Sequence, residues 1–434
     1  LHRAAAVWFA AQGLIDESLH HALAVDDLDL AARLMQAGLC DVLNREDRAT
    51  LERWLRLLPE DFIGHRPWLL MFKALALQFS SQLPAMWKLL GQIEALIEEG
   101  SEAAHAGDGD GLPVLRGLVA ALRSQETFSQ SQPSSALAYC AQALALLPPQ
   151  WRYARGGALM FWGMSMRATG QGEAVHRMLM DEYESLLGKN DAYSLRILFT
   201  VCLNALETGN LDQVRQVAQV LLEQATLGQL VILQGWAHFF LGAVHYQWNE
   251  LETTAHHYEQ VVDRRYAVHT QAARNSMVGL VWVHLARAES GEARQSVELL
   301  SQLDIERMGQ ERDDTRSLRA QMEYLHGESA KALRWADAYT APASDRLLNW
   351  LQDPHLARSR ILLARGTDDD LQAALDISAS LLELAERNFS TRFQIDILSL
   401  RAVAVAAQGN AAAALAALRQ AVQLTRPGGF IRVF

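Results

Sequence analysis

The chain has 434 residues, of which 50% are hydrophobic and 21% charged, and its formal net charge is −11 at pH 7. This length exceeds one ordinary hydrophobic core, so it predicts several domains or a repeat array, and the composition is that of a soluble globular protein. The negative charge argues against direct nucleic-acid contact, and no apolar run approaches the roughly 20 residues of a membrane span.

The N-terminal part, residues 1–106, is predicted to be helical but irregular, with short turns at Gly13 and at Asp26–Asp27. Its first residues carry neither a start methionine nor a signal-peptide pattern, and we expect them to belong to a longer polypeptide. The composition then shifts to Gly and Asp at 107–112, which predicts a loop. The Gly-Asp-Gly-Asp-Gly run there lacks the frame of a calcium-binding loop, which favours a simple connection.

Residues 113–426 show a repeat. Seven turns, each placing Gly or Asn before a helix of small residues, follow one another at intervals of 36 to 43 residues. The turn residues are Gly170, Gly209, Asn249, Gly291, Gly327, Gly366 and Gly409. Gly and Asn can adopt the left-handed conformation that ends a helix, and one such hairpin cannot bury its apolar face alone. We therefore predict an all-α fold, a right-handed superhelix of tetratricopeptide-like helix hairpins with a period of about 40 residues.

The second helix of each hairpin carries alanines just after its turn, and we expect them where two helices cross, because small side chains allow close approach. These are Ala174, Ala255, Ala293, Ala330 and Ala412. In the hairpin that follows Gly366, the run Thr367–Asp370 is predicted to be a helix N-cap with acidic residues that complement the helix dipole.

No residue pattern indicates catalysis or metal binding, and we predict that the chain is not an enzyme. The pairs His20–His21 and His256–His257 are the most metal-like features, but adjacent side chains on a helix diverge by about 100° and cannot chelate one ion from one face. Surface or interface histidines are the better interpretation. The cysteines, Cys40, Cys140 and Cys202, lie in apolar helical contexts and are predicted to be free thiols in a reducing cytoplasm.

The repeat array is instead predicted to provide a ligand-binding surface. The first helix of each hairpin is expected to line the concave side, where ligands usually lie. The inward positions combine amphipathic aromatic side chains with hydrogen-bonding groups, a mixture typical of sites for small organic or sugar-like molecules. The candidates are Arg196, Phe199, Trp236, Phe239, Tyr246, Asn275, Trp282 and His284. The alternative for these aromatic residues is that they pack between neighbouring hairpins.

Three stretches resemble the MalT-like family of large ATP-binding LuxR-type transcriptional regulators. The first spans residues 1–35, and the second is a Trp-Leu…Leu-Pro-Glu helix end at 54–60 followed by Arg66 and Pro67. The third is the terminal RPGGFIRVF, which is similar to the segment ahead of the DNA-binding domain in that family. Residues 427–434 are accordingly expected to begin a linker to that domain.

The resemblance implies a cytoplasmic transcriptional activator with an ATP-binding module, a helical-repeat sensor and a helix-turn-helix domain. This chain corresponds to the sensor. It contains no G-x-x-x-x-G-K-[ST] motif and no helix-turn-helix, so ATP is implied only for an N-terminal module outside it and no cofactor is expected within it. The expected partners are a small-molecule inducer and copies of the full-length protein. A second interpretation gives the same groove to a peptide or a regulatory protein.

Overall fold

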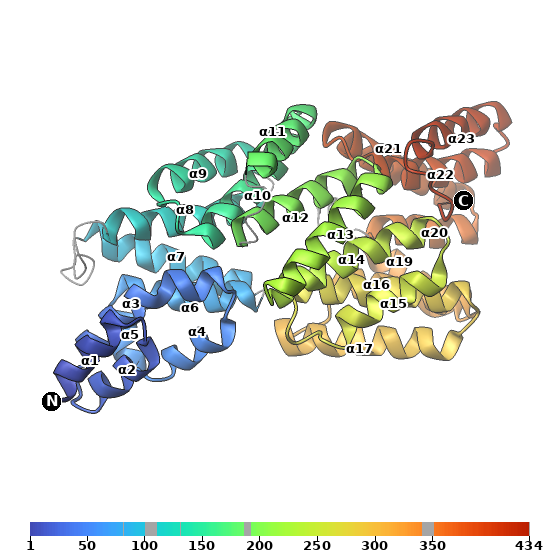
Figure 1. Cartoon of the computed structure of the whole chain (residues 1–434). Helices are drawn as coiled ribbons and strands as arrows, with labels where there is room; N and C mark the ends of the chain where they lie inside the picture. The colour runs from blue at the N-terminus through green and yellow to red at the C-terminus, as the bar shows by residue number, and fades with distance from the viewer. Residues whose placement is uncertain (81, 100–110, 131, 186–191, 341–350, 434) are drawn as a thin grey trace. The chain divides into compact units, whose positions relative to one another are not determined.

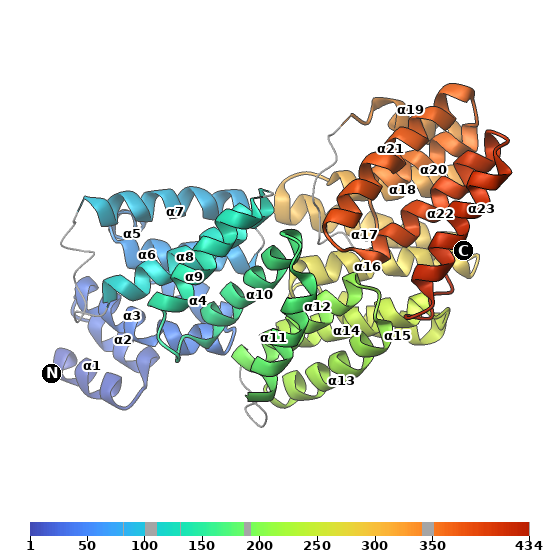
Figure 2. The ribbon, with the colours of Figure 1, turned by 90° about the horizontal axis from the view of Figure 1, so that it is seen from above.

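A computed structural model of the chain describes residues 1–80, 82–99, 111–130, 132–185, 192–340 and 351–433. Every regular element within these ranges is a helix, and they are labelled α1 to α23 (Figure 1). Successive helices run back and forth through short turns, as Figure 2 shows for α20 to α23. The prediction of an all-α, tetratricopeptide-like fold is confirmed.

The chain divides into two compact units. Unit 1 comprises residues 1–165 and 188–197, and unit 2 comprises residues 166–187 and 198–434. The division falls within α10 and α12. The predicted loop at 107–112 lies outside the described residues, except for Gly111 and Leu112, which begin α8.

The helices that begin in unit 1 are α1 (His2–Ala11), α2 (Ile15–Leu23), α3 (Leu28–Asn44), α4 (Arg48–Leu55), α5 (Glu60–Gly64), α6 (Pro67–Phe79), α7 (Leu83–Glu98), α8 (Gly111–Ser129), α9 (Pro133–Leu146), α10 (Arg152–Ala168) and α12 (Ala192–Glu207). Unit 2 begins with α11 (Gly172–Ser185) and continues with α13 (Leu211–Leu227), α14 (Val231–Gln247), α15 (Leu251–Val262), α16 (Thr270–Ala286) and α17 (Ser290–Met308). It ends with α18 (Asp313–Leu325), α19 (Ser329–Ala338), α20 (Pro354–Arg365), α21 (Asp368–Arg387), α22 (Thr391–Ala407) and α23 (Ala411–Thr425).

Six of the seven predicted turn residues adopt the left-handed backbone conformation. Their φ angles lie between 62° at Asn249 and 87° at Gly170. The exception is Gly291, which is the second residue of α17, and here Ala288 takes the positive φ of 59° instead. The predicted cap at Thr367 is confirmed as a capping box, in which the hydroxyl accepts from the amide of Asp370 and the carboxylate of Asp370 accepts from the amide of Thr367.

The prediction for the crossing alanines is wrong for three of the five. Ala255 and Ala293 are buried, whereas Ala174, Ala330 and Ala412 are exposed. In these three helices the buried face starts one or two residues later, at Val175, Ala332 and Ala414. A shift of two positions turns a side chain by about 200° around a helix, so a small error in register moves a residue from the interface to the surface.

Close packing in the middle of unit 2 depends on two glycines. The ring of Tyr258 on α15 is fully buried between α14 and α16. A Cβ atom added at Gly242 would lie 2.5 Å from this ring, and one added at Gly279 would lie 2.2 Å from it. Three consecutive helices therefore approach one another over a single aromatic side chain.

A buried charge network connects the next helices. Arg274 on α16 is 1% exposed, and its Nε lies 2.6 Å from Oδ1 of Asp304 while its Nη2 lies 2.8 Å from Oδ1 of Asp314. The hydroxyl of Thr315 donates to Asp304 at 2.6 Å. Burial alone would raise the pKa of the Asp314 carboxyl, but the guanidinium groups of Arg274 and Arg312 hold that pKa well below its ordinary value. The network thereby joins α16, α17 and α18.

Gly279→Ala is expected to destabilise the protein by about 1–3 kcal/mol, because the added methyl group overlaps the Tyr258 ring and the surrounding core is closely packed. Thermal unfolding measures the effect. Gly291→Ala is the matched control, since an added Cβ there meets no atom within 4 Å and the residue lies in a helix, where alanine is favoured. Equal melting temperatures for the two variants would contradict the packing role of Gly279.

Arg274→Met is expected to cost about 3–5 kcal/mol, because it leaves the carboxylates of Asp304 and Asp314 buried without their cation. Urea unfolding followed by circular dichroism measures this change. Arg419→Met, which removes an exposed arginine from α23, should leave the unfolding midpoint almost unchanged. A loss below about 1 kcal/mol in Arg274→Met would mean that the network is solvated rather than buried.

Candidate functional site

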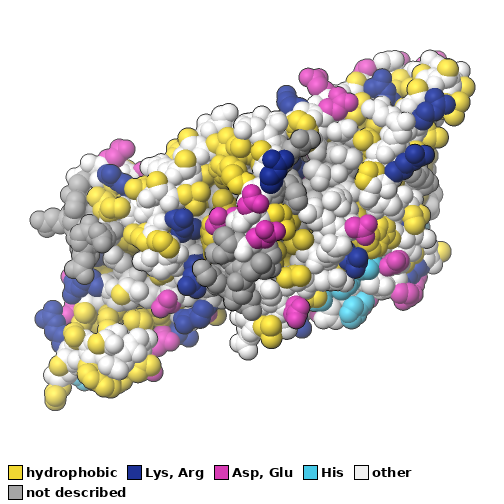
Figure 3. Space-filling model, turned by 45° about the horizontal axis from the view of Figure 1, so that its top comes forward, with side chains coloured by type: hydrophobic (Ala, Val, Ile, Leu, Met, Phe, Trp, Pro, Cys, Tyr) yellow, Lys and Arg dark blue, Asp and Glu magenta, His cyan; other side chains and the backbone are white. Residues whose placement is uncertain are grey.

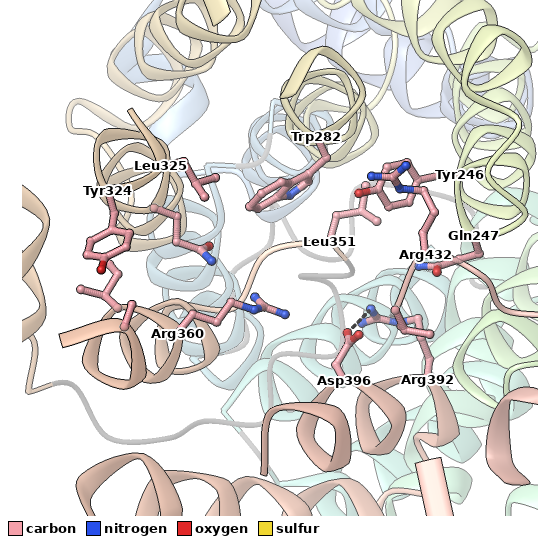
Figure 4. Close-up of a pocket in the computed structure, with 14 residues that line it drawn as sticks. Tyr246, Gln247, Trp282, Tyr324, Leu325, Leu351, Arg360, Arg392, Asp396 and Arg432 are labelled. Atoms are coloured by element: carbon pink, nitrogen blue, oxygen red, sulfur yellow. Dashed lines mark ion pairs between the residues drawn. The ribbon is translucent and has the colours of Figure 1, made fainter. Parts of the chain in front are cut away.

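A cavity of about 460 Å³ lies inside unit 2 (Figure 4). Its volume is within the range of about 300–1,000 Å³ that is usual for sites that bind small molecules. The lining residues are Tyr246, Gln247, Trp282, Gln321, Tyr324, Leu325, Leu351, Arg360, Ile361, Ala364, Arg392, Asp396, Arg432 and Val433.

The helical part of the lining comes only from alternate helices. These are α14, α16, α18, α20 and α22, the first helix of each of five consecutive hairpins. Several of these residues are spaced three or four apart within one helix, such as Arg360 with Ala364 and Arg392 with Asp396, so they share one helical face. First helices, which the sequence analysis expects on the concave side, thus supply the helical lining of this cavity.

Arginine side chains provide the charge in the cavity. Arg392 is 6% exposed, and its Nη1 lies 3.7 Å from Oδ2 of Asp396, an ion pair that is longer than a hydrogen bond. Burial raises the pKa of the Asp396 carboxyl, although the nearby guanidinium groups of Arg392 and Arg360 oppose that shift. Arg360 makes no hydrogen bond or ion pair to any residue that the structure describes, and Figure 4 shows its guanidinium group directed into the cavity.

Aromatic side chains form much of the remaining wall. The indole of Trp282 and the phenol rings of Tyr246 and Tyr324 come from three different helices. The guanidinium carbon of Arg432 lies 5.1 Å from the centre of the Tyr246 ring, within reach of a cation–π contact. The Tyr246 hydroxyl, like that of other tyrosines, is protonated near neutral pH and can donate a hydrogen bond, and burial raises its pKa further.

The last lining residues belong to residues 427–433, here called the C-terminal segment. This segment packs against the turn between α14 and α15. The amide of Ile431 donates to the carbonyl of Gln247 at 2.8 Å, and Nε1 of Trp248 donates to the carbonyl of Gly428 at 2.9 Å. Phe430 is 6% exposed. The residues expected to start a linker therefore form part of the wall of the cavity.

Only two of the eight candidate residues line this cavity, namely Tyr246 and Trp282. Phe199, Trp236 and Phe239 are buried, and their rings contact one another and Phe240, with centroids of Phe199 and Trp236 5.1 Å apart. This arrangement corresponds to the alternative in which aromatic residues pack between hairpins. It occurs because the inward positions of a first helix also face the neighbouring first helix.

The other three candidates have local partners. Arg196 lies in unit 1, where it forms an ion pair with Glu46 and its guanidinium carbon lies 4.1 Å from the Tyr153 ring centre. Asn275 is buried and accepts a hydrogen bond from Gln271. His284 lies in the last turn of α16 and contacts Glu289 at 2.8 Å.

The charged part of the cavity was not among the candidates. Arg360 and Arg392 occupy on α20 and α22 the same kind of inward position that Trp282 occupies on α16, so extending the register by two and three hairpins along the chain finds them. Arg432 lies after the last helix, in a stretch of sequence without a periodic hydrophobic pattern. No sequence signal places it in the site.

The cysteines and His257 lie in buried or partly buried surroundings. The three cysteines are free, and burial raises the pKa of the Cys140 thiol to about 12. Nδ1 of His257 lies 3.0 Å from Nδ1 of His238, and burial lowers the pKa of both imidazoles to about 4. The described part of the chain contains no group of three His, Cys, Asp or Glu side chains that could hold a metal ion.

Surface charge and helix hydropathy are relevant to nucleic acids and membranes as partners. On the face drawn in Figure 3, basic and acidic side chains are interspersed, without a continuous basic patch. Among the described residues, none of the helices is both long enough and apolar enough to cross a membrane.

Comparison with known proteins gives one family. The model of the MalT-like TPR region matches residues 117–434, well over half of the chain. Three solved structures are similar over 98% of this chain. A chain of the Cut9–Hcn1 hetero-tetramer of the APC/C is 14% identical, with a TM-score of 0.36 and 87% of its length covered. Yeast Tom70 is 10% identical, with a TM-score of 0.41 and 91% of its length covered. A monomeric mutant of IFIT1 with Gppp-AAAA is 12% identical, with a TM-score of 0.41 and 90% of its length covered.

Phe430→Ala is expected to release the C-terminal segment without unfolding the repeats, because Phe430 is the large apolar side chain that the segment buries, at 6% exposure. Hydrogen exchange at the amides of Ile431 and Arg432 should become about ten- to hundredfold faster. Ile431→Ala is the matched control, since this side chain is 57% exposed. Unchanged exchange in Phe430→Ala would show that the hydrogen bonds alone hold the segment.

Proposed function

This chain belongs to the MalT-like TPR family, and from that premise we propose that it is the effector-sensing region of a transcriptional activator. In this role it binds a small-molecule inducer in the cavity of unit 2. We further propose that it acts in the cytoplasm, is not an enzyme and holds no cofactor of its own. ATP and DNA contacts are assigned to other modules of the full-length regulator.

The single observation that carries this proposal is the cavity lined by α14, α16, α18, α20 and α22. It combines three aromatic side chains with arginine, glutamine and aspartate side chains that converge from five hairpins. Sites for small molecules have this composition, with mostly apolar walls and a few polar groups that orient the ligand. The volume of about 460 Å³ also fits a compact molecule better than a peptide of several residues.

Binding would act by differential affinity. A ligand that contacts several hairpins at once binds more tightly to the arrangement in which those hairpins are correctly spaced, and so it shifts the population toward that arrangement. In the full-length protein we propose that this arrangement favours self-association. The coupling free energy between inducer and self-association is reciprocal, so oligomers should bind the inducer more tightly than monomers.

Trp282→Ala is expected to weaken inducer binding at least about tenfold, because it removes the largest aromatic wall of the cavity. Isothermal titration calorimetry of the chain against a metabolite library identifies the ligand and measures the loss. Trp335→Ala is the control, since this half-buried tryptophan lies on α19, a second helix outside the cavity.

Two results would contradict the proposal. One is a small molecule that binds equally well to Trp282→Ala. The other is the absence of any small-molecule binding, together with capture of a regulatory protein that Trp282→Ala abolishes. The second result would assign the groove to a protein partner instead.

A further inference from the structure

The charge on the walls of the cavity indicates the chemical class of its ligand. The ionisable side chains that line it include three arginines, Arg360, Arg392 and Arg432, and one carboxylate, Asp396. Arginine is always protonated near neutral pH, so the walls carry at least two positive charges more than the single aspartate can neutralise. The nearby Asp353 is not part of the lining, and its carboxylate caps α20 by accepting from the amides of His355 and Leu356.

The arginines also have unused hydrogen-bonding capacity. Nε of Arg392 and Nε of Arg432 are buried and have no hydrogen-bond partner in the part of the chain that the structure describes. The ion pair of Arg392 with Asp396 spans 3.7 Å, whereas Arg360, whose side chain is exposed, makes no hydrogen bond or ion pair with any described residue. A buried donor without an acceptor is costly, with a penalty that an added acceptor would remove.

We propose, on the basis of the proposed function, that the cavity takes a small organic anion whose carboxylate or phosphate group is bound by Arg360, Arg392 and Arg432. Guanidinium groups bind planar oxyanions through paired hydrogen bonds, and such charge-assisted bonds are the strong ones. The rings of Trp282 and Tyr246 then contact the apolar part of the ligand. The carboxyl of Asp396 lies beside Arg392 and accepts from a hydroxyl of the ligand or, when protonated, donates to its oxyanion.

This arrangement connects the ligand to the end of the chain. Arg360 and Arg392 belong to the repeats, whereas Arg432 belongs to the C-terminal segment, whose contacts to α14 include the hydrogen bond from Ile431 to Gln247. An oxyanion held by all three guanidinium groups bridges the repeats and this segment. Occupancy of the cavity therefore stabilises the docked position of the C-terminal segment, in addition to stabilising unit 2.

Citrate serves as the probe, and its uncharged trimethyl ester is the matched control. Citrate should raise the melting temperature of the chain relative to chloride at equal ionic strength and slow hydrogen exchange at the amides of Ile431 and Arg432, whereas the ester should do neither. Inorganic phosphate as a second probe separates the preference for phosphate from that for carboxylate. Arg360→Met and Arg432→Met should each weaken the effect about tenfold or more, and Arg419→Met on α23 should not.

The variants separate site binding from general salt effects. Citrate and phosphate stabilise many proteins because they are excluded from protein surfaces, and such stabilisation would be equal in all three variants. That result, or equal binding of the ester, overturns the assignment of an anion. If a neutral metabolite then binds in a manner that requires Trp282, the effector-sensing function stands without its anionic ligand. If neither charged nor neutral molecules bind, both proposals fail.

Discussion

The structure of unit 2 depends on one constraint, which is that a helix hairpin of this size cannot bury its apolar face alone. Stacking of hairpins satisfies that need and places like helices next to like helices, so α14 contacts α16, α18 contacts α20, and α20 contacts α22. Side chains three or four residues apart on these helices then face a common space. The cavity is a consequence of the stacking, and its chemistry depends on which residues occupy that shared face.

The stacked interior of unit 2 also contains polar groups, such as Arg274 and Asp304. At the packed centre, Tyr258 fills the space between Gly242 and Gly279, and the helices approach closely. One hairpin further, Arg274 is neutralised by Asp304 and Asp314 within hydrogen-bonding distance. In the cavity the arginines outnumber the carboxylates. Arg274 is thus held by two carboxylates within hydrogen-bonding distance, whereas Arg392 is paired with a single carboxylate, Asp396, at 3.7 Å.

The repeat was predictable from the sequence because it depends on local chemistry. A residue with positive φ ends a helix wherever it occurs, and six of seven turn residues were identified correctly on that basis. The rotation of each helix about its own axis was less predictable, because it depends on neighbours that are distant in sequence. Ala330 and Ala412 are exposed for this reason, and Trp236 packs against Phe199 and Phe240 instead of lining the cavity.

Arg432 shows where sequence reasoning from periodicity ends. It lies beyond the last helix, in a stretch that contains Pro427, Gly428 and Gly429. Its position depends on the buried Phe430, on the backbone contacts to Gln247 and on the hydrogen bond that its Nη1 donates to Oδ1 of Asn249 at 2.8 Å. A segment held by few contacts has a low free energy of local release, so a modest additional interaction changes its docked population substantially. We infer that an arginine at such a position makes the segment responsive to an anion in the cavity, whereas the arginines on α20 and α22 connect that anion to the repeats.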